Sequence, residues 1–105
     1  MAANDRNDLE DGDEDSGLAE LIPLYFALCR RDLLSLRTAL EGTDFNQVRI
    51  LGHNLRGSGG AYGFPELSEI GAVIETAGKT KDADLARDGI AKLAGFLEAH
   101  QESKA

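Results

Sequence analysis

Apolar residues recur every three or four positions in four stretches of the sequence, and short breaks containing glycine or proline separate these stretches. This spacing is that of a helix with one buried face, and little in the chain suggests strands. Pro65 suits the first turn of a helix, where its missing N–H is not needed, and Asp44 with Gln47 resembles a capping box. Helices are therefore expected from Pro23 to about Gly42, from Asp44 to Gly63, from Pro65 to about Gly78, and from Asp82 or Asp84 to Leu97.

Four helices of roughly 15–20 residues with such short connections pack as antiparallel neighbours. The expected fold is therefore all-α, an antiparallel up-down-up-down four-helix bundle. Residues 18–22 form one further apolar turn before Pro23, which predicts a short extra N-terminal helix. In the second helix a single stripe of residues faces the core: Val48, Leu51, Leu55, Gly59 and Tyr62.

Most of the negative charge lies near the N-terminus. The net charge of the 105 residues is −8, and residues 1–17 hold seven acidic side chains against Arg6. A segment this polar cannot bury enough apolar surface to order itself, so we expect a disordered acidic tail over 1–17 and a folded domain over 18–105. The folded part is nearly neutral, which argues against a nucleic-acid-binding protein because that function needs a clustered basic surface.

Several other classes are disfavoured. A single cysteine, Cys29, excludes an internal disulfide and a Cys-rich zinc site. Neither histidine lies in a Glu-x-x-His motif, so no metal site is expected. No apolar run approaches 18 residues and no signal peptide is present, which favours a cytoplasmic protein without membrane contact. We expect a monomer, and Met1 with its acidic leader favours a stand-alone protein.

The segment 52–63 continues the second helical pattern, yet it has glycine at positions 52, 57, 59 and 60. Each glycine inside a helix costs up to ~1 kcal/mol relative to alanine, so the group costs ~3–4 kcal/mol. Helical projection places His53 opposite the buried stripe, with Gly57 and Gly60 beside it and Gly59 facing a neighbouring helix. Glycines on the exposed face have no packing reason, but they clear a space through which another protein reaches the imidazole.

Cationic residues surround this histidine. Arg56 follows His53 by three positions and Arg49 precedes it by four, so both guanidiniums are expected to flank the ring. A neutral imidazole is a competent nucleophile near pH 7, and a phosphoryl group on it would add about −1.5 to −2 charge for arginine to offset. The pattern indicates a phosphoryl-accepting histidine rather than a metal ligand, although an exposed histidine near an arginine also occurs by chance.

A longer pattern surrounds His53: the run His-Asn-Leu-Arg-Gly-Ser-Gly-Gly-Ala-Tyr-Gly-Phe from His53 to Phe64, then Leu67, Ile70 and Glu75. It resembles the histidine-containing phosphotransfer (HPt) domain of bacterial multistep two-component phosphorelays. The resemblance covers about 18–97 and is most specific over 53–75. It implies the same helical bundle and a role in phosphotransfer.

The resemblance also implies roles for individual residues. His53 would be the phosphoacceptor, and Arg56, at a position where the family usually has lysine, would stabilise the charge of the phosphate. Glu75 would orient the imidazole by accepting a hydrogen bond from Nδ1. Gly57 would give the partner access, and Ser58 is the small residue that follows it.

A carrier of this family would take a phosphoryl group from the aspartate of one response-regulator receiver domain and pass it to another. A hybrid sensor histidine kinase would be the upstream partner. The receiver would supply Mg²⁺, so the chain itself needs no cofactor, and the absence of an ATP motif makes it a stoichiometric carrier rather than an enzyme. Ile50 and Phe64 project near His53 and are expected to contact the receiver.

Two other functions stay open. The chain could be a non-phosphorylated adaptor that binds a receiver or a histidine kinase and regulates it. It could also be a structural helical bundle with an incidental histidine. The presence of His53 argues against the adaptor, and the exposed glycines argue against the structural bundle.

Overall fold

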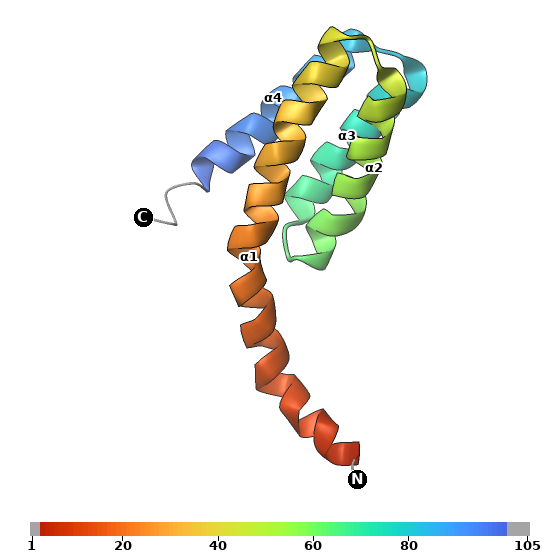
Figure 1. Cartoon of the computed structure of the whole chain (residues 1–105). Helices are drawn as coiled ribbons and strands as arrows, with labels where there is room; N and C mark the ends of the chain where they lie inside the picture. Colours follow the sequence, from red (N-terminus) through yellow and green to blue (C-terminus); the bar gives the residue numbers. More distant parts are fainter. Residues whose placement is uncertain (1–2, 101–105) are drawn as a thin grey trace.

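The computed structural model describes residues 3–100, and it describes side chains from residue 19 onward. Helix α1 spans Ala3–Glu41, α2 spans Phe45–Ala61, α3 spans Pro65–Thr80 and α4 spans Ala83–Ala99. Figure 1 shows successive helices running in opposite directions, with the N-terminal part of α1 extending past the other three.

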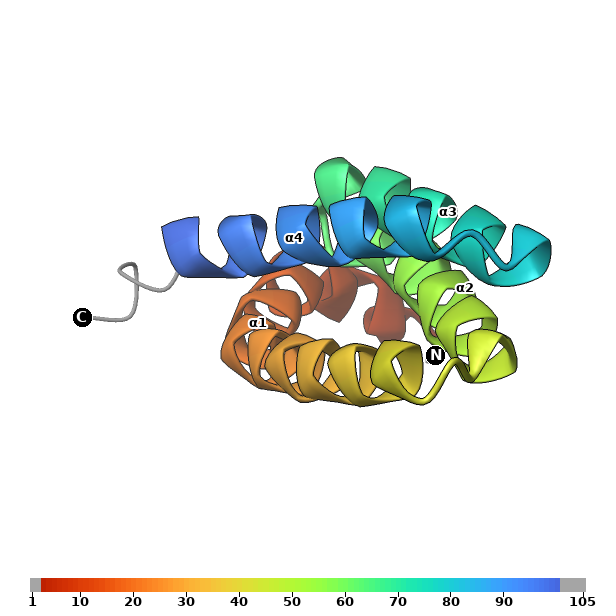
Figure 2. The ribbon, with the colours of Figure 1, turned by 90° about the horizontal axis from the view of Figure 1, so that it is seen from above.

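The four helices form two layers. Figure 2 shows α1 beside α2 in one layer and α4 beside α3 in the other. Each helix packs against two neighbours in the ring α1–α2–α3–α4, and α2 with α3 make the most extensive contact. The predicted all-α antiparallel four-helix bundle is confirmed. None of the helices within residues 3–100 is long and apolar enough to cross a membrane.

Aspartate side chains begin two of the helices. The Asp44 carboxylate accepts the N–H of Gln47 at 3.1 Å and so caps α2, as the capping-box spacing predicts. Asp82 rather than Asp84 caps α4, because its carboxylate accepts the N–H of Leu85 at 3.0 Å. Each cap satisfies a backbone donor that the first turn of a helix leaves without a partner.

Helix α3 ends later than the sequence predicts. It runs to Thr80, and Lys81 follows with the left-handed φ of 56° that closes many helices. Gly78 lies inside α3, where an added Cβ would stand 2.6 Å from the Cα of Arg49 on α2. This glycine therefore serves close helix packing, which spacing alone does not distinguish from a helix end.

The predicted break at Pro23 is wrong. Pro23 lies inside α1, which continues on both sides of it, so no separate short N-terminal helix precedes the bundle. The reason is that the apolar stripe is continuous across the proline: Ile22 packs against the core one turn before Phe26. A proline inside a helix removes one hydrogen bond and crowds the carbonyl group four residues earlier, and continued burial on one face offsets this cost.

The acidic segment also differs from its expected form. The structure continues α1 through residues 3–17, where the sequence predicts disorder, and this part of the helix lies beyond the bundle in Figure 1. Residues 1 and 2 lie outside the described range. The division of the chain at residue 17 into a tail and a domain stays a prediction.

The core lies between the two layers and draws on every helix. Its largest fully buried side chains are Leu36, Val48, Leu67, Ile74, Leu93 and Cys29. Tyr25 of α1 stacks on Tyr62 with ring centroids 4.1 Å apart, and its hydroxyl lies 2.7 Å from that of Ser58 on α2. These contacts fix which flank of α1 adjoins α2.

Cys29 is only 2% exposed, and this burial raises the pKa of its thiol to about 11. Because the thiolate is the reactive form, we expect iodoacetamide to alkylate the native protein at pH 8 at least ~100-fold more slowly than the denatured chain. Mass spectrometry of timed samples measures both rates. Equal alkylation rates in the native and denatured protein would show that the packing of α1 does not keep Cys29 buried.

Candidate functional site

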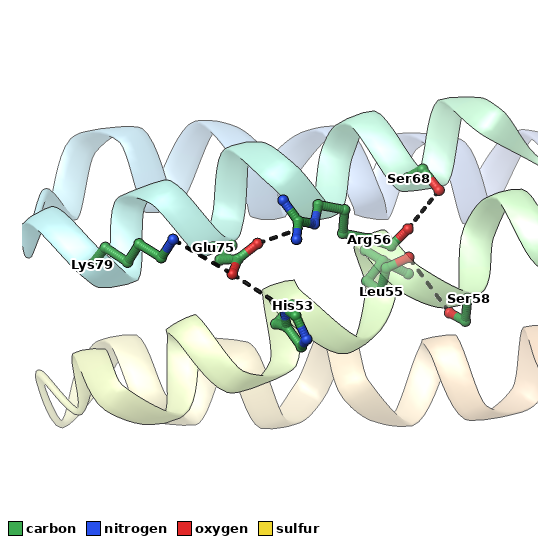
Figure 3. A network of polar contacts seen from close by, with 7 residues as sticks. All are labelled: His53, Leu55, Arg56, Ser58, Ser68, Glu75 and Lys79. Carbon is green, nitrogen blue, oxygen red and sulfur yellow. Dashed lines mark hydrogen bonds and ion pairs between the residues drawn. The ribbon is translucent and has the colours of Figure 1, made fainter.

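His53 lies on the outer face of α2 with 58% of its side chain exposed, as helical projection predicts. Its Nδ1 is 3.1 Å from Oε2 of Glu75 on α3 (Figure 3). Because an ionised carboxylate only accepts hydrogen bonds, Nδ1 is the donor in this pair. In the neutral ring the other nitrogen, Nε2, then carries no proton and keeps its lone pair.

The side chain of Glu75 is only 8% exposed, and its carboxylate contacts three groups that are positively charged or donate a hydrogen bond. Its Oε1 is 3.3 Å from Arg56 Nε, and its Oε2 is 3.8 Å from Lys79 Nζ. Burial alone would raise the pKa of Glu75, but the hydrogen bond from His53 and the charges of Arg56 and Lys79 outweigh burial and hold this pKa below its ordinary value. The carboxylate is therefore ionised at neutral pH.

The cations at the site are not the two that the sequence predicts. Arg56 reaches Glu75 from α2, but Arg49 donates from Nη2 to the Asn46 side chain at 2.8 Å. The expectation that Arg49 flanks the imidazole is therefore wrong. Lys79 takes part instead and was missed. Its position four residues after Glu75 is the spacing of a helical ion pair and was the available signal.

The glycines near His53 differ in what surrounds them. An added Cβ on Gly57 would meet nothing within 4 Å, so open space lies over this position as predicted. Gly60 instead donates its N–H to Ser68 Oγ at 2.8 Å, and an added Cβ would lie 3.3 Å from the same oxygen. The expectation that Gly60 has no packing role is wrong. Gly59 faces α3 as predicted, with an added Cβ 2.5 Å from the Ser68 nitrogen.

Ser58 and Ile50 lie on either side of His53 along α2. The Ser58 hydroxyl is 3.4 Å from the Leu55 carbonyl oxygen and also contacts Tyr25, so it ties α2 to α1. Ile50 is half-buried and stands just under one turn before the histidine. Its place on this face agrees with the predicted docking position, and its contact with a partner stays a prediction.

Phe64 does not lie beside His53. Its ring is 5.1 Å from that of Phe26 and 6.0 Å from that of Phe96, in an aromatic cluster that also includes His100. The expected projection of Phe64 toward the receiver is wrong, because α2 ends at Ala61 and the helical projection does not extend into the turn that follows. The ring of His100 stacks on that of Phe96, with centroids 4.0 Å apart, and is part of the packing.

Comparison with known proteins identifies the family of this chain. The Hpt domain family model matches residues 20–103. Multistep phosphorelay regulator 1 of the fission yeast Schizosaccharomyces pombe is 28% identical over 86 residues, which are 82% of this chain and 28% of that protein. The chain therefore spans little more than a quarter of that relative's length. No solved structure matches the chain significantly. Because the family model covers most of the chain, this protein belongs to the Hpt domain family.

Proposed function

We propose that the chain is a phosphorelay carrier whose His53 accepts a phosphoryl group from the aspartyl phosphate of one receiver domain and passes it to the aspartate of another. The observation that carries this proposal is the pairing of an exposed imidazole with a buried carboxylate, at 3.1 Å between Nδ1 and Oε2. Membership of the Hpt domain family supports it. So does the name of the fission-yeast relative, which assigns that protein to a multistep phosphorelay.

The geometry suits in-line transfer with no proton moved at the reacting nitrogen. The Nε2 lone pair attacks phosphorus and forms an N–P bond while the bond from phosphorus to the aspartate oxygen breaks, and the carboxylate leaves with that electron pair. The ring, still protonated at Nδ1, becomes positively charged, and Glu75 faces this charge at 3.1 Å. In the second transfer the new aspartate attacks phosphorus and the imidazole leaves neutral.

Arg56 is proposed to stabilise the charge of the phosphoryl group. It lies just under one turn after His53, and its Nε already contacts Glu75 at 3.3 Å. A guanidinium has five N–H donors in a planar fork, so one contact to Glu75 leaves others for a phosphoryl oxygen. Arginine in place of lysine keeps the charge, and transfer is expected to proceed.

The proposed partners are response-regulator receiver domains and, upstream, a hybrid sensor histidine kinase. The resemblance to the HPt family implies that the receiver holds the Mg²⁺, and each step proposed for this chain uses its own side chains. In this proposal the chain is a stoichiometric carrier and not a kinase. We expect it to act in the cytoplasm as a monomer.

The receiver is proposed to dock over apolar side chains of α1 and α2 that are not fully buried. Ile50 stands before His53 on α2 and is half-buried. Leu28 of α1 is 45% exposed and lies just under one turn after Tyr25, on the flank that Tyr25 holds against Ser58 of α2. Exposed leucine and isoleucine on adjoining helices form the kind of apolar surface that marks a protein interface.

We expect Leu28→Asp and Ile50→Asp each to weaken receiver binding by about 10-fold or more, because each would bury an unpaired carboxylate in an apolar contact. Leu34→Asp is the control: this leucine is also on α1 and is more exposed than Leu28, at 62% against 45%, and it points about 120° away from Leu28 around the helix. Titration of each variant with a receiver gives the dissociation constants. Wild-type affinity in both test variants would place the docking surface elsewhere.

A transfer assay tests the proposed function. A receiver domain charged with a small phosphodonor and Mg²⁺ is mixed with this protein, and the protein is examined for acid-labile, base-stable phosphate. The carrier proposal predicts that such label appears on the chain while the receiver loses it. No label from any of several receivers that bind the chain would overturn the carrier proposal and favour the adaptor.

A further inference from the structure

A seam of four glycines joins α2 to α3. Two lie seven residues apart on α2 and two lie seven residues apart on α3, so each pair recurs on one face of its helix. Every one of them faces the backbone of the opposite helix. An added Cβ would lie 2.8 Å from Glu75 Cα at Gly52, 2.5 Å from Ser68 N at Gly59, 2.8 Å from Arg56 Cα at Gly71, and 2.6 Å from Arg49 Cα at Gly78.

The two central glycines of this seam lie directly against the residues of the phosphotransfer site. Gly52 precedes His53 and packs on the backbone of Glu75. Gly71 packs on the backbone of Arg56, and an added Cβ there would also lie 2.8 Å from the carbonyl oxygen of Gly52. Each interior glycine costs up to ~1 kcal/mol relative to alanine, so a helix pair that only needed to pack would be more stable with alanine and a wider spacing.

We propose that Gly52 and Gly71 are positioning residues that set the separation of α2 and α3 so that the Glu75 carboxylate reaches His53 Nδ1 and Arg56 Nε. They act through Glu75 and touch no phosphoryl group themselves. The expected effect on phosphoryl transfer rests on the proposed function. The expected effect on the orientation of the unphosphorylated imidazole is independent of that function.

The distances show why the separation matters. An ordinary van der Waals contact of a Cβ begins at 3.4 Å, so alanine at position 52 would push the Glu75 Cα, now 2.8 Å from the added Cβ, outward by at least about 0.6 Å, because the Glu75 backbone nitrogen lies closer still. The Nδ1–Oε2 distance of 3.1 Å is already near the upper end for an N–H···O hydrogen bond. An added shift of about 0.6 Å would carry it beyond hydrogen-bonding range.

The test compares Gly52→Ala with Gly59→Ala in the full unphosphorylated chain. Both substitutions place a methyl group against the backbone of α3, but only position 52 lies opposite Glu75. Thermal unfolding measures the packing loss, and the ¹⁵N chemical shifts of the His53 ring at pH 8 report which nitrogen carries the proton. We expect both variants to have lower unfolding midpoints. Only Gly52→Ala is expected to lose the Nδ1–H form, and its phosphoryl acceptance should then slow by about 10-fold or more.

Two results would overturn the proposal. Retention of the wild-type His53 spectrum in folded Gly52→Ala would show that Glu75 follows the ring despite the wider spacing. An equal change in Gly59→Ala would show that the seam affects the ring only through general stability.

A second variant keeps the proposal testable if Gly52→Ala does not fold. Glu75→Asp withdraws the carboxylate by one methylene group and leaves every glycine in place. This variant is expected to lose the Nδ1–H form of His53 in the same way. If it kept that form, the distance between the carboxylate and the ring would not determine the position of the proton, and the proposal would be overturned. Failure of the proposed function can be distinguished from failure of this inference. In the first case the wild-type chain would accept no phosphate label, while the His53 spectra of all variants would still be as expected.

Discussion

Replacing His53 with glutamine is expected to abolish phosphoryl acceptance from a charged receiver while leaving the fold and receiver binding intact. A carboxamide nitrogen has no available lone pair, so the variant lacks the proposed nucleophile. The side chain is 58% exposed, and a substitution at such a surface position usually changes the free energy of unfolding by less than about 0.5 kcal/mol. Loss of label would therefore reflect chemistry and not unfolding.

The measurement is the amount of label transferred to each variant, with thermal unfolding and receiver affinity recorded in parallel. His100→Gln is the control, since His100 is the other histidine of the sequence and stacks on Phe96 in the aromatic cluster. We expect His100→Gln to accept label like the wild type. Persistent label on His53→Gln would mean that another residue is the acceptor.

Replacing Glu75 with leucine is expected to slow phosphoryl acceptance by about 100-fold. Leucine removes the acceptor that keeps the proton on Nδ1, so the ring populates the form in which Nε2 is protonated and cannot attack. It also removes the negative charge facing the ring as phosphorylation makes it cationic. Glu75→Gln keeps a side-chain oxygen at position 75 that can accept a hydrogen bond from Nδ1. We therefore expect its rate of phosphoryl acceptance to fall by less than about 10-fold.

Initial rates of transfer at saturating receiver separate this effect from docking, because neither substitution alters Ile50 or Leu28. Arg56 and Lys79 are more than half exposed and remain hydrated when their carboxylate partner is removed, so the leucine variant is expected to fold. A Glu75→Leu protein that accepts phosphate at the wild-type rate would show that His53 orients without this carboxylate.

The sequence was most informative where one residue acts on its own helix. Asp44 and Asp82 cap the backbone within their own first turns, and His53 is exposed because it lies opposite the buried stripe of α2. Periodicity describes each helix about its own axis, and these features depend on nothing else. The cap of α2 and the exposure of His53 could therefore be predicted from spacing, which also limited the cap of α4 to Asp82 or Asp84.

Of the features that the sequence did not predict, some depend on the direction in which side chains lean along one helix, and others depend on a second helix. Side chains of a helix lean toward its N-terminus, so Arg49 leans away from His53 and reaches Asn46, whereas Lys79 leans toward Glu75. Gly60 and Gly78 face α3 and α2 at distances that no single-helix pattern reveals. Glu75 itself was found only through the family resemblance, because its partners lie on α2 as well as on α3.

The central claim is that Nε2 of His53 receives phosphorus because Glu75 holds the proton at Nδ1. The most direct test is NMR of the ¹⁵N-labelled chain after phosphorylation by a charged receiver, which identifies the ring nitrogen coupled to ³¹P. We predict phosphorus on Nε2 of His53 with the proton retained on Nδ1. Phosphorus on Nδ1, or on any residue other than His53, would contradict the account.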